Sequence, residues 1–277
     1  HQSKINKHKH CVSFIKKFAD ELLYEMNLSN QMQNGILQKQ FSLAFQPKVN
    51  SHKNKLIGVE VLLRWQMKNG QSISPAVFIP IAEKNGFIIE LGNWIIHSTL
   101  NQIREWLDNY IPVVPVSVNV SAIQFRQPQF IDYLFMQLDF YQIPGELLEI
   151  ELTEGVLMQD IEGIISVLKK IRERGVSVSI DDFGTGYSSL SYLPLLPVDS
   201  LKIDKAFMHQ IHINRDNQKI VQTIVNLANN FNLTIIAEGV ETALELSETQ
   251  RCGITNVQGY FYSHPLSNKH LIKDWLH

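Results

Sequence analysis

The sequence has few cysteines, no long apolar run and almost no net charge. Its two cysteines, Cys11 and Cys252, lie far apart in 277 residues, which favours a reducing compartment such as the cytoplasm over a disulfide framework. It shows no membrane-spanning run and no signal peptide. The formal net charge of −2 lacks the basic excess of proteins that bind nucleic-acid polymers. A compact anionic ligand would therefore need metal ions or a few well-placed cations.

Two adjacent carboxylates end one strongly patterned strand, at residues 176–181. Its apolar residues alternate with serine before Asp181 and Asp182, and a Gly-Thr-Gly turn follows. Carboxylates held this close repel each other unless a cation lies between them. The kinase triplet Asp-Phe-Gly occurs here without an upstream His-Arg-Asp, and Ser189 replaces the third glycine of a dinucleotide fingerprint. A metal site is favoured over both of these and over a ligand-free Asx turn.

Strands and helices alternate along most of the chain. A basic, His-rich arm, an amphipathic helix from Phe14 to Met26 and a polar helical segment at 30–40 come first. The patterns predict strands at 41–49, 56–63, 114–119, 147–152, 176–181, 200–203, 233–237 and 254–258. They predict helices near 75–84, 91–109, 130–140, 161–174, 218–231 and 242–249, the last with a capping box formed by Thr242 and Glu245.

Eight predicted strands that alternate mostly with helices favour one fold class, an α/β (β/α)8 barrel of the TIM type. The turn between the first two strands is short, so we expect these two strands to run antiparallel. An open doubly wound sheet is the alternative. We divide the chain into an N-terminal basic arm and connector helix, 1–32, and a barrel domain, 33–277.

Polar residues recur in the predicted strands, mostly at their carboxyl ends, which share one rim in a barrel. They are Glu60, Asn119, Glu151, Asp181, Lys202, Glu238 and Gln258. With Asp182 the set holds five carboxylates, which one lysine cannot neutralise. Hard oxygen ligands without Cys or His select Mg²⁺ or Mn²⁺, and this many carboxylates suit two ions that activate a water against a phosphate ester. Ca²⁺ fits the same ligands, but its looser geometry would position the water poorly.

Seven motifs in order resemble those of the EAL-domain cyclic di-GMP phosphodiesterases, from about Gln33 to the C-terminus. They are EVLLRW at 60–65, SVNVS at 117–121, ELTE at 151–154, DDFGTGY at 181–187, LKID at 201–204, AEGVE at 237–241 and QGY at 258–260. The resemblance implies a barrel with a reversed first strand, and hydrolysis of cyclic di-GMP to linear pGpG with Mg²⁺ or Mn²⁺. It also implies a homodimer. From the chemistry of the ligands we expect Ca²⁺ to bind but to inhibit, and separately we expect a sensory or cyclase domain upstream of this chain.

The resemblance also implies a role for each matching residue. Glu60, Asn119, Glu151 and Asp181 resemble the ligands of one ion, and Asp181, Asp182 and Glu238 those of a second. Lys202 resembles the residue that orients or deprotonates the attacking water, and Gln258 a further contact at the rim. Glu154 resembles a glutamate that braces the loop after Asp182, a loop that couples metal binding to dimerisation. The implied substrate contacts are Gln46, Leu62, Arg64 and Glu241.

Three positions depart from the family pattern without removing an implied ligand: Val61 replaces an alanine, Gly155 a serine and His264 a basic residue. We expect Val61 to have a modest effect, because β-branched residues suit strands. Two alternative functions remain open. One is a receptor of the same fold that binds cyclic di-GMP without cleaving it, and the other is a barrel that acts through protein contacts alone.

Overall fold

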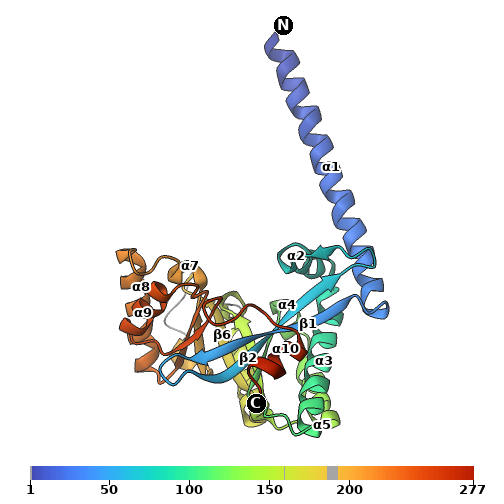
Figure 1. Ribbon diagram of the computed structural model, residues 1–277. Helices are drawn as coiled ribbons and strands as arrows, with labels where there is room; N and C mark the ends of the chain where they lie inside the picture. Colours follow the sequence, from blue (N-terminus) through green and yellow to red (C-terminus); the bar gives the residue numbers. More distant parts are fainter. Residues whose placement is uncertain (1, 159, 186–192) are drawn as a thin grey trace. The chain divides into compact units, whose positions relative to one another are not determined.

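The computed structural model describes residues 2–158, 160–185 and 193–277. The described residues form two compact units. The smaller unit holds the residues up to Ser42 together with Arg64–Leu91, and the larger unit holds Leu43–Leu63 together with the residues from Gly92 onward. Figure 1 colours the chain from α1, in blue, to α10, in red. The proposed boundary between residues 32 and 33 stays a prediction.

The smaller unit is built around helix α1, Gln2–Leu37. The sequence predicted two separate helical segments here, but the structure has one continuous helix, and neither Pro nor Gly interrupts it before Gly35. A Cβ atom at Gly35 would lie 2.8 Å from the Phe41 ring, so the glycine permits a close approach of the helix to this ring. Helix α2, Pro75–Asn85, and the two-residue strand β3, Ser72–Ile73, complete the unit.

The larger unit holds a closed barrel of eight strands. The short strand β3 pairs with Trp65 and Gln66 at the end of β2, and these residues belong to the smaller unit. The barrel strands are β1 (Phe41–Asn50), β2 (Lys55–Gln66), β4 (Val116–Asn119), β5 (Leu148–Thr153), β6 (Ser177–Phe183), β7 (Ser200–Ile203), β8 (Thr234–Glu238) and β9 (Asn256–Gln258). Strand β1 is antiparallel to β9 and also pairs with β2, which closes the sheet, while the pairs from β2 and β4 through β8 and β9 are parallel. The predicted barrel with a reversed first strand is confirmed, and the open sheet is excluded.

Helices follow most of the barrel strands. The longer ones are α3 (Ile88–Asp108), α5 (Phe130–Tyr141), α6 (Ile161–Glu173), α8 (Arg215–Asn230) and α9 (Ala243–Arg251) (Figure 1). The sequence missed three short helices, α4 (Ala122–Phe125), α7 (Lys205–Met208) and α10 (Asn268–Asp274). The capping box of Thr242 and Glu245 is present at the start of α9. Among the described residues, no helix combines the length and the apolarity that crossing a membrane requires.

The pleat of each strand separates an apolar face from a polar one. In β5, Leu148, Ile150 and Leu152 are fully buried in the hydrophobic core. Their neighbours Glu149 and Glu151 point the other way, since side chains alternate along a strand. Each of these carboxylates forms an ion pair with a lysine from another strand. The barrel interior is therefore charged, and the main core lies outside the barrel.

Candidate metal centre

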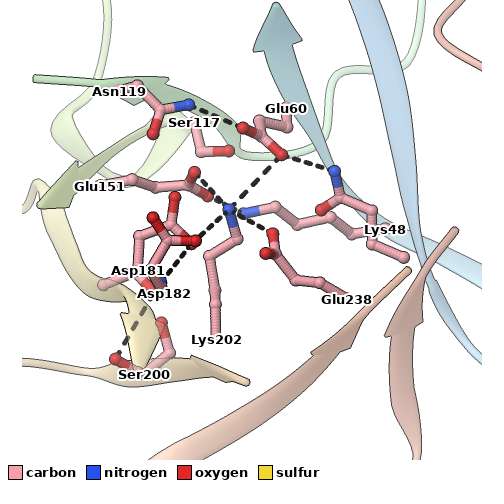
Figure 2. Close-up of polar contacts among 12 residues, drawn as sticks. Lys48, Glu60, Ser117, Asn119, Glu151, Asp181, Asp182, Ser200, Lys202 and Glu238 are labelled. Carbon is pink, nitrogen blue, oxygen red and sulfur yellow. Dashed lines mark hydrogen bonds and ion pairs between the residues drawn. The ribbon is translucent and has the colours of Figure 1, made fainter. Parts of the chain in front are cut away.

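The ammonium group of Lys202 lies at the centre of the carboxylate cluster (Figure 2). Lys202 projects from β7 and is fully buried. Its Nζ lies 2.6 Å from Glu151, 2.7 Å from Glu238, 3.2 Å from Asp181 and 3.4 Å from Glu60. These acidic residues come from four different strands, so closure of the barrel brings them together as the sequence predicted.

A second buried lysine, which the sequence reasoning missed, lies beside the first. Lys48 on β1 is 3% exposed, and its Nζ lies 2.5 Å from Glu149 and 2.6 Å from Glu151. Its partner Glu149 was also missed. The only signal in the sequence is the spacing: Lys48 follows Gln46 by two positions, and Glu149 precedes Glu151 by two. That spacing places each pair on one face of its strand.

A backbone irregularity turns Asp181 and Asp182 toward one site. The pairing of β6 with β7 shifts register between Ile180 and Phe183. Within this bulge Asp182 adopts a left-handed conformation, with φ 53°, and its N–H donates to the Asp181 carboxylate at 2.9 Å. Neighbouring side chains of a regular strand would point to opposite faces, so the bulge allows both carboxylates to reach the same site.

Two side-chain amides hold the Glu60 carboxylate from either side. Asn119 Nδ2 donates to Glu60 Oε1 at 2.6 Å, and Gln258 Nε2 donates to Glu60 Oε2. Gln258 Nε2 also donates to Gln46 Oε1 at 3.1 Å, and Gln46 Nε2 donates to the Ser263 carbonyl oxygen. The Gln258 Oε1 atom is buried, and no described residue hydrogen-bonds to it. An ion or a water could satisfy this oxygen.

Burial, and to a lesser degree mutual repulsion, raises the pKa of three carboxylates in the cluster. Burial and the Glu151 charge raise the pKa of Glu60. Burial raises the pKa of Glu238 to about 8; the ammonium of Lys202 opposes this, and the charges of Asp181 and Glu60 add to it. Burial and the Asp181 charge raise the pKa of Asp182 to about 6. Glu238 therefore holds its proton near neutral pH unless further positive charge neutralises the cluster.

Glu151 behaves in the opposite way. Burial alone would raise its pKa, but the two ammonium groups of Lys202 and Lys48 outweigh burial and lower the pKa to about 2. Burial alone would likewise lower the pKa of both lysines, yet Glu151 and the neighbouring carboxylates raise each one above its usual value. Glu151 and the two lysines therefore stay charged together at neutral pH.

The carboxylates form two triplets with the geometry of a metal site. One carboxylate oxygen from each of Glu60, Glu151 and Asp181 lies within 4.8 Å of the other two, and the same holds for Asp181, Asp182 and Glu238. Asp181 belongs to both triplets. Carboxylate and amide oxygens are hard ligands that suit Mg²⁺ or Mn²⁺ rather than zinc. The cluster can hold divalent ions, and the unpartnered oxygen of Gln258 is consistent with this.

The other predicted site residues have different surroundings. Glu154 is buried, and its Oε2 accepts from the Gly184 N–H at 3.3 Å, which ties it to the turn after Asp182. Leu62 is half-buried on β2, and Glu241 is exposed after β8. Arg64 lies further along β2, in the smaller unit. Residues 186–192 of the predicted loop lie outside the described part of the chain.

The side chain of Val61, which replaces the family's alanine, points to the opposite face of β2 from that of Glu60. It alternates with Glu60 along β2, is 3% exposed and belongs to the hydrophobic core outside the barrel. Its two extra methyl groups relative to alanine therefore bury apolar surface away from the carboxylates.

Comparison with known proteins agrees with this architecture. Residues 29–265 match the EAL domain family. The chain belongs to the EAL domain family. The bifunctional diguanylate cyclase/cyclic di-GMP phosphodiesterase MucR of Pseudomonas aeruginosa is 36% identical over 248 residues, which cover 90% of this chain and 36% of that protein. The cyclic di-GMP phosphodiesterase NbdA of the same organism is 33% identical over 266 residues, covering 96% of this chain and 34% of that protein.

A solved structure resembles this one over most of its length. The structure described as the PaMucR phosphodiesterase in complex with c-di-GMP has a TM-score of 0.84 and 37% sequence identity, and the match covers 88% of this chain and 99% of that one. This EAL chain spans about a third of the length of the curated relatives that it matches.

Proposed function

We propose that this EAL domain is a metal-dependent phosphodiesterase that hydrolyses cyclic di-GMP to linear pGpG. The observation that carries the proposal is the pair of carboxylate triplets that share Asp181 around the Lys202 ammonium. The names of the relatives, and the cyclic di-GMP complex of a similar structure, support the choice of substrate.

In this proposal Glu60, Asn119, Glu151 and Asp181 hold one Mg²⁺ or Mn²⁺ ion, and Asp181, Asp182 and Glu238 hold a second. When bound, two such ions would polarise the phosphodiester and lower the pKa of a nearby water. Water attacks phosphorus, one ester P–O bond breaks, and the released oxygen takes a proton.

The chain itself supplies orientation. Lys202 Nζ lies among carboxylates of both triplets, so we assign it the task of orienting the attacking water. Gln258 fixes Glu60 and contributes a further contact at the rim. Gln46, Leu62, Arg64 and Glu241 remain the proposed substrate contacts, with Arg64 suited to a phosphate because its guanidinium donates two parallel hydrogen bonds.

The decisive experiment is chromatographic analysis of cyclic di-GMP after incubation with the protein. We expect pGpG in the presence of Mg²⁺ or Mn²⁺ and none after a chelator is added. Ca²⁺ should bind without supporting turnover, because its looser coordination positions a water poorly. Tight binding of cyclic di-GMP that leaves it intact after long incubation with either metal would instead identify the chain as a receptor.

The family resemblance also suggests a homodimer whose contacts involve the loop after Asp182, with Glu154 bracing that loop. Two longer relatives are named as a diguanylate cyclase and as an oxygen sensor, and this chain matches only part of each. They support the proposal of an additional sensory or cyclase domain. The cytoplasmic location expected from the cysteine content also stays a prediction. Analytical ultracentrifugation with and without Mg²⁺ would test the dimer.

A further inference from the structure

Lys48 is a buried charge that the proposed reaction does not use. It projects from β1 into the barrel, and its ammonium lies within 2.6 Å of two carboxylates, those of Glu149 and Glu151. Burying an ammonium is costly, and the cost is recovered only where partners satisfy it closely. The position of Lys48 therefore needs a reason beyond the packing of β1.

The contact with Glu151 supplies that reason. Lys48 donates to Glu151 Oε1 at 2.6 Å, while Lys202 donates to Glu151 Oε2 at 2.6 Å (Figure 2). A carboxylate held at both oxygens by lysines from different strands cannot rotate freely about its last bond. One of its oxygens then stays within 4.8 Å of a carboxylate oxygen of Glu60 and of one of Asp181, with which Glu151 forms a triplet.

A simpler interpretation is that Lys48 only neutralises Glu149. That pair alone would account for one hydrogen bond at 2.5 Å, but it would not account for the equally short bond to Glu151. Glu149 and Glu151 lie on the same face of β5, two residues apart, and Lys48 bridges them. Lys48 thus links Glu149, which belongs to neither triplet, to Glu151, which belongs to one of them.

We propose that Lys48 is a positioning residue, which fixes the Glu151 carboxylate for the ion bound by Glu60, Glu151 and Asp181. This inference rests on the proposed metal-dependent function. The charges agree with it: the carboxylates of Glu60, Glu149, Glu151, Asp181, Asp182 and Glu238 and the ammonium groups of Lys48 and Lys202 leave a formal charge of −4, which two divalent ions would balance.

The Lys48→Met substitution should change Mn²⁺ affinity in two opposite ways. Loss of the ammonium leaves extra negative charge, which would tighten Mn²⁺ binding if charge were all that mattered. Loss of the hydrogen bond frees Glu151, which would weaken binding. The double variant Lys48→Met/Glu149→Gln separates the two effects, because it removes one charge of each sign and keeps the net charge of the barrel.

The test is calorimetric titration of the whole chain with Mn²⁺ alone, with the electron paramagnetic resonance spectrum of bound Mn²⁺ as a second readout. We expect the double variant to bind one of two Mn²⁺ ions about 10- to 100-fold more weakly, the usual effect of losing a partner that orients a metal ligand. The second ion should bind nearly as in the wild type, whereas a general loss of structure would weaken both.

Circular dichroism would establish that each variant is folded. If Lys48→Met does not fold, the double variant alone is used for the test. A matched control is Arg251→Met/Glu248→Gln, which removes an ion pair on α9 that contacts neither triplet. This control should bind Mn²⁺ as the wild type does.

Three results would overturn the inference. The first is wild-type affinity in the double variant, and the second is tighter binding by the double variant. Either one, together with Mn²⁺-dependent turnover by the wild type, would refute the role of Lys48 and leave the proposed function intact. The third, absence of Mn²⁺ binding by the wild type, would refute both.

Discussion

Glu245 forms an internal brace next to the proposed active site. Its carboxylate accepts from the backbone N–H of Gln210 at 2.9 Å, of Glu241 at 2.9 Å and of Thr242 at 3.0 Å. It is 3% exposed and lies in the first turn of α9. These bonds join the segment after β8, which follows Glu238, to the segment after α7.

Glu245→Gln should destabilise the fold by about 2 kcal/mol at pH 7. The amide oxygen can still accept from Glu241 and Thr242, but the amide NH₂ group then faces the Gln210 N–H and cannot accept from it. A lost hydrogen bond to a charged group, which leaves a donor unpaired, costs about 1.5–3 kcal/mol. Urea unfolding followed by circular dichroism would measure the difference.

The difference should depend on pH with a definite sign. Burial alone would raise the pKa of Glu245, but the three backbone N–H donors and Thr242 hold it below its ordinary value of 4.5. A carboxylate whose pKa is lowered by folding contributes stability that is fully present above its unfolded pKa. That stability is lost as the pH falls through the folded pKa, so the gap between wild type and variant should close in acid.

Glu248→Gln is the matched control on the same helix. Its carboxylate pairs with Arg251, whose side chain is exposed, and solvent screening leaves such pairs with little effect on stability. Equal loss in the two variants at pH 7, or a Glu245→Gln deficit that persists unchanged in acid, would refute the reasoning.

Further predictions concern the candidate metal centre and the smaller unit. Glu60→Ala and Asp181→Ala should each abolish pGpG formation, measured by chromatography, because each removes a proposed ligand; turnover by either would exclude that ligand role. Lys202→Ala should lower kcat more than it raises the Kd for cyclic di-GMP, and equal losses would contradict its assigned role. Gly35→Ala should destabilise the protein by about 1–3 kcal/mol in urea, because its Cβ would lie 2.8 Å from the Phe41 ring; unchanged stability would show that the ring can move away.

The barrel could be predicted from the sequence because its strands carry a readable pattern. Apolar residues such as Val178 and Ile180 alternate with serine and then with Asp181, so both the strand and its polar end are visible. The short helices were harder to predict. Helix α10 has seven residues and only one buried apolar side chain, Leu271, so it lacks the repeated apolar spacing that marks longer helices.

The candidate site was only partly visible in the sequence. The strand-end carboxylates stand out because charge is unusual in an apolar strand. Lys48 does not stand out, since a lysine beside Pro47 reads as a surface residue at the edge of a strand. Its partner Glu149 lies 101 residues away, and only closure of the barrel brings the two together.

The bulge at Asp181 and Asp182 has a consequence for how ions would exchange. Glu60 and Glu151, in the first triplet, project from regular parallel pairings, whereas Asp182 lies in the bulge and leads into a turn. In that turn Thr185 donates its backbone N–H and its hydroxyl to the Asp182 carbonyl oxygen, and the Gly184 N–H donates to Glu154. A small rotation of that turn would move the carboxylate of Asp182 without moving those of Glu60 and Glu151. In the proposed two-ion site, an ion held by Asp181, Asp182 and Glu238 would therefore dissociate before an ion held by Glu60, Glu151 and Asp181.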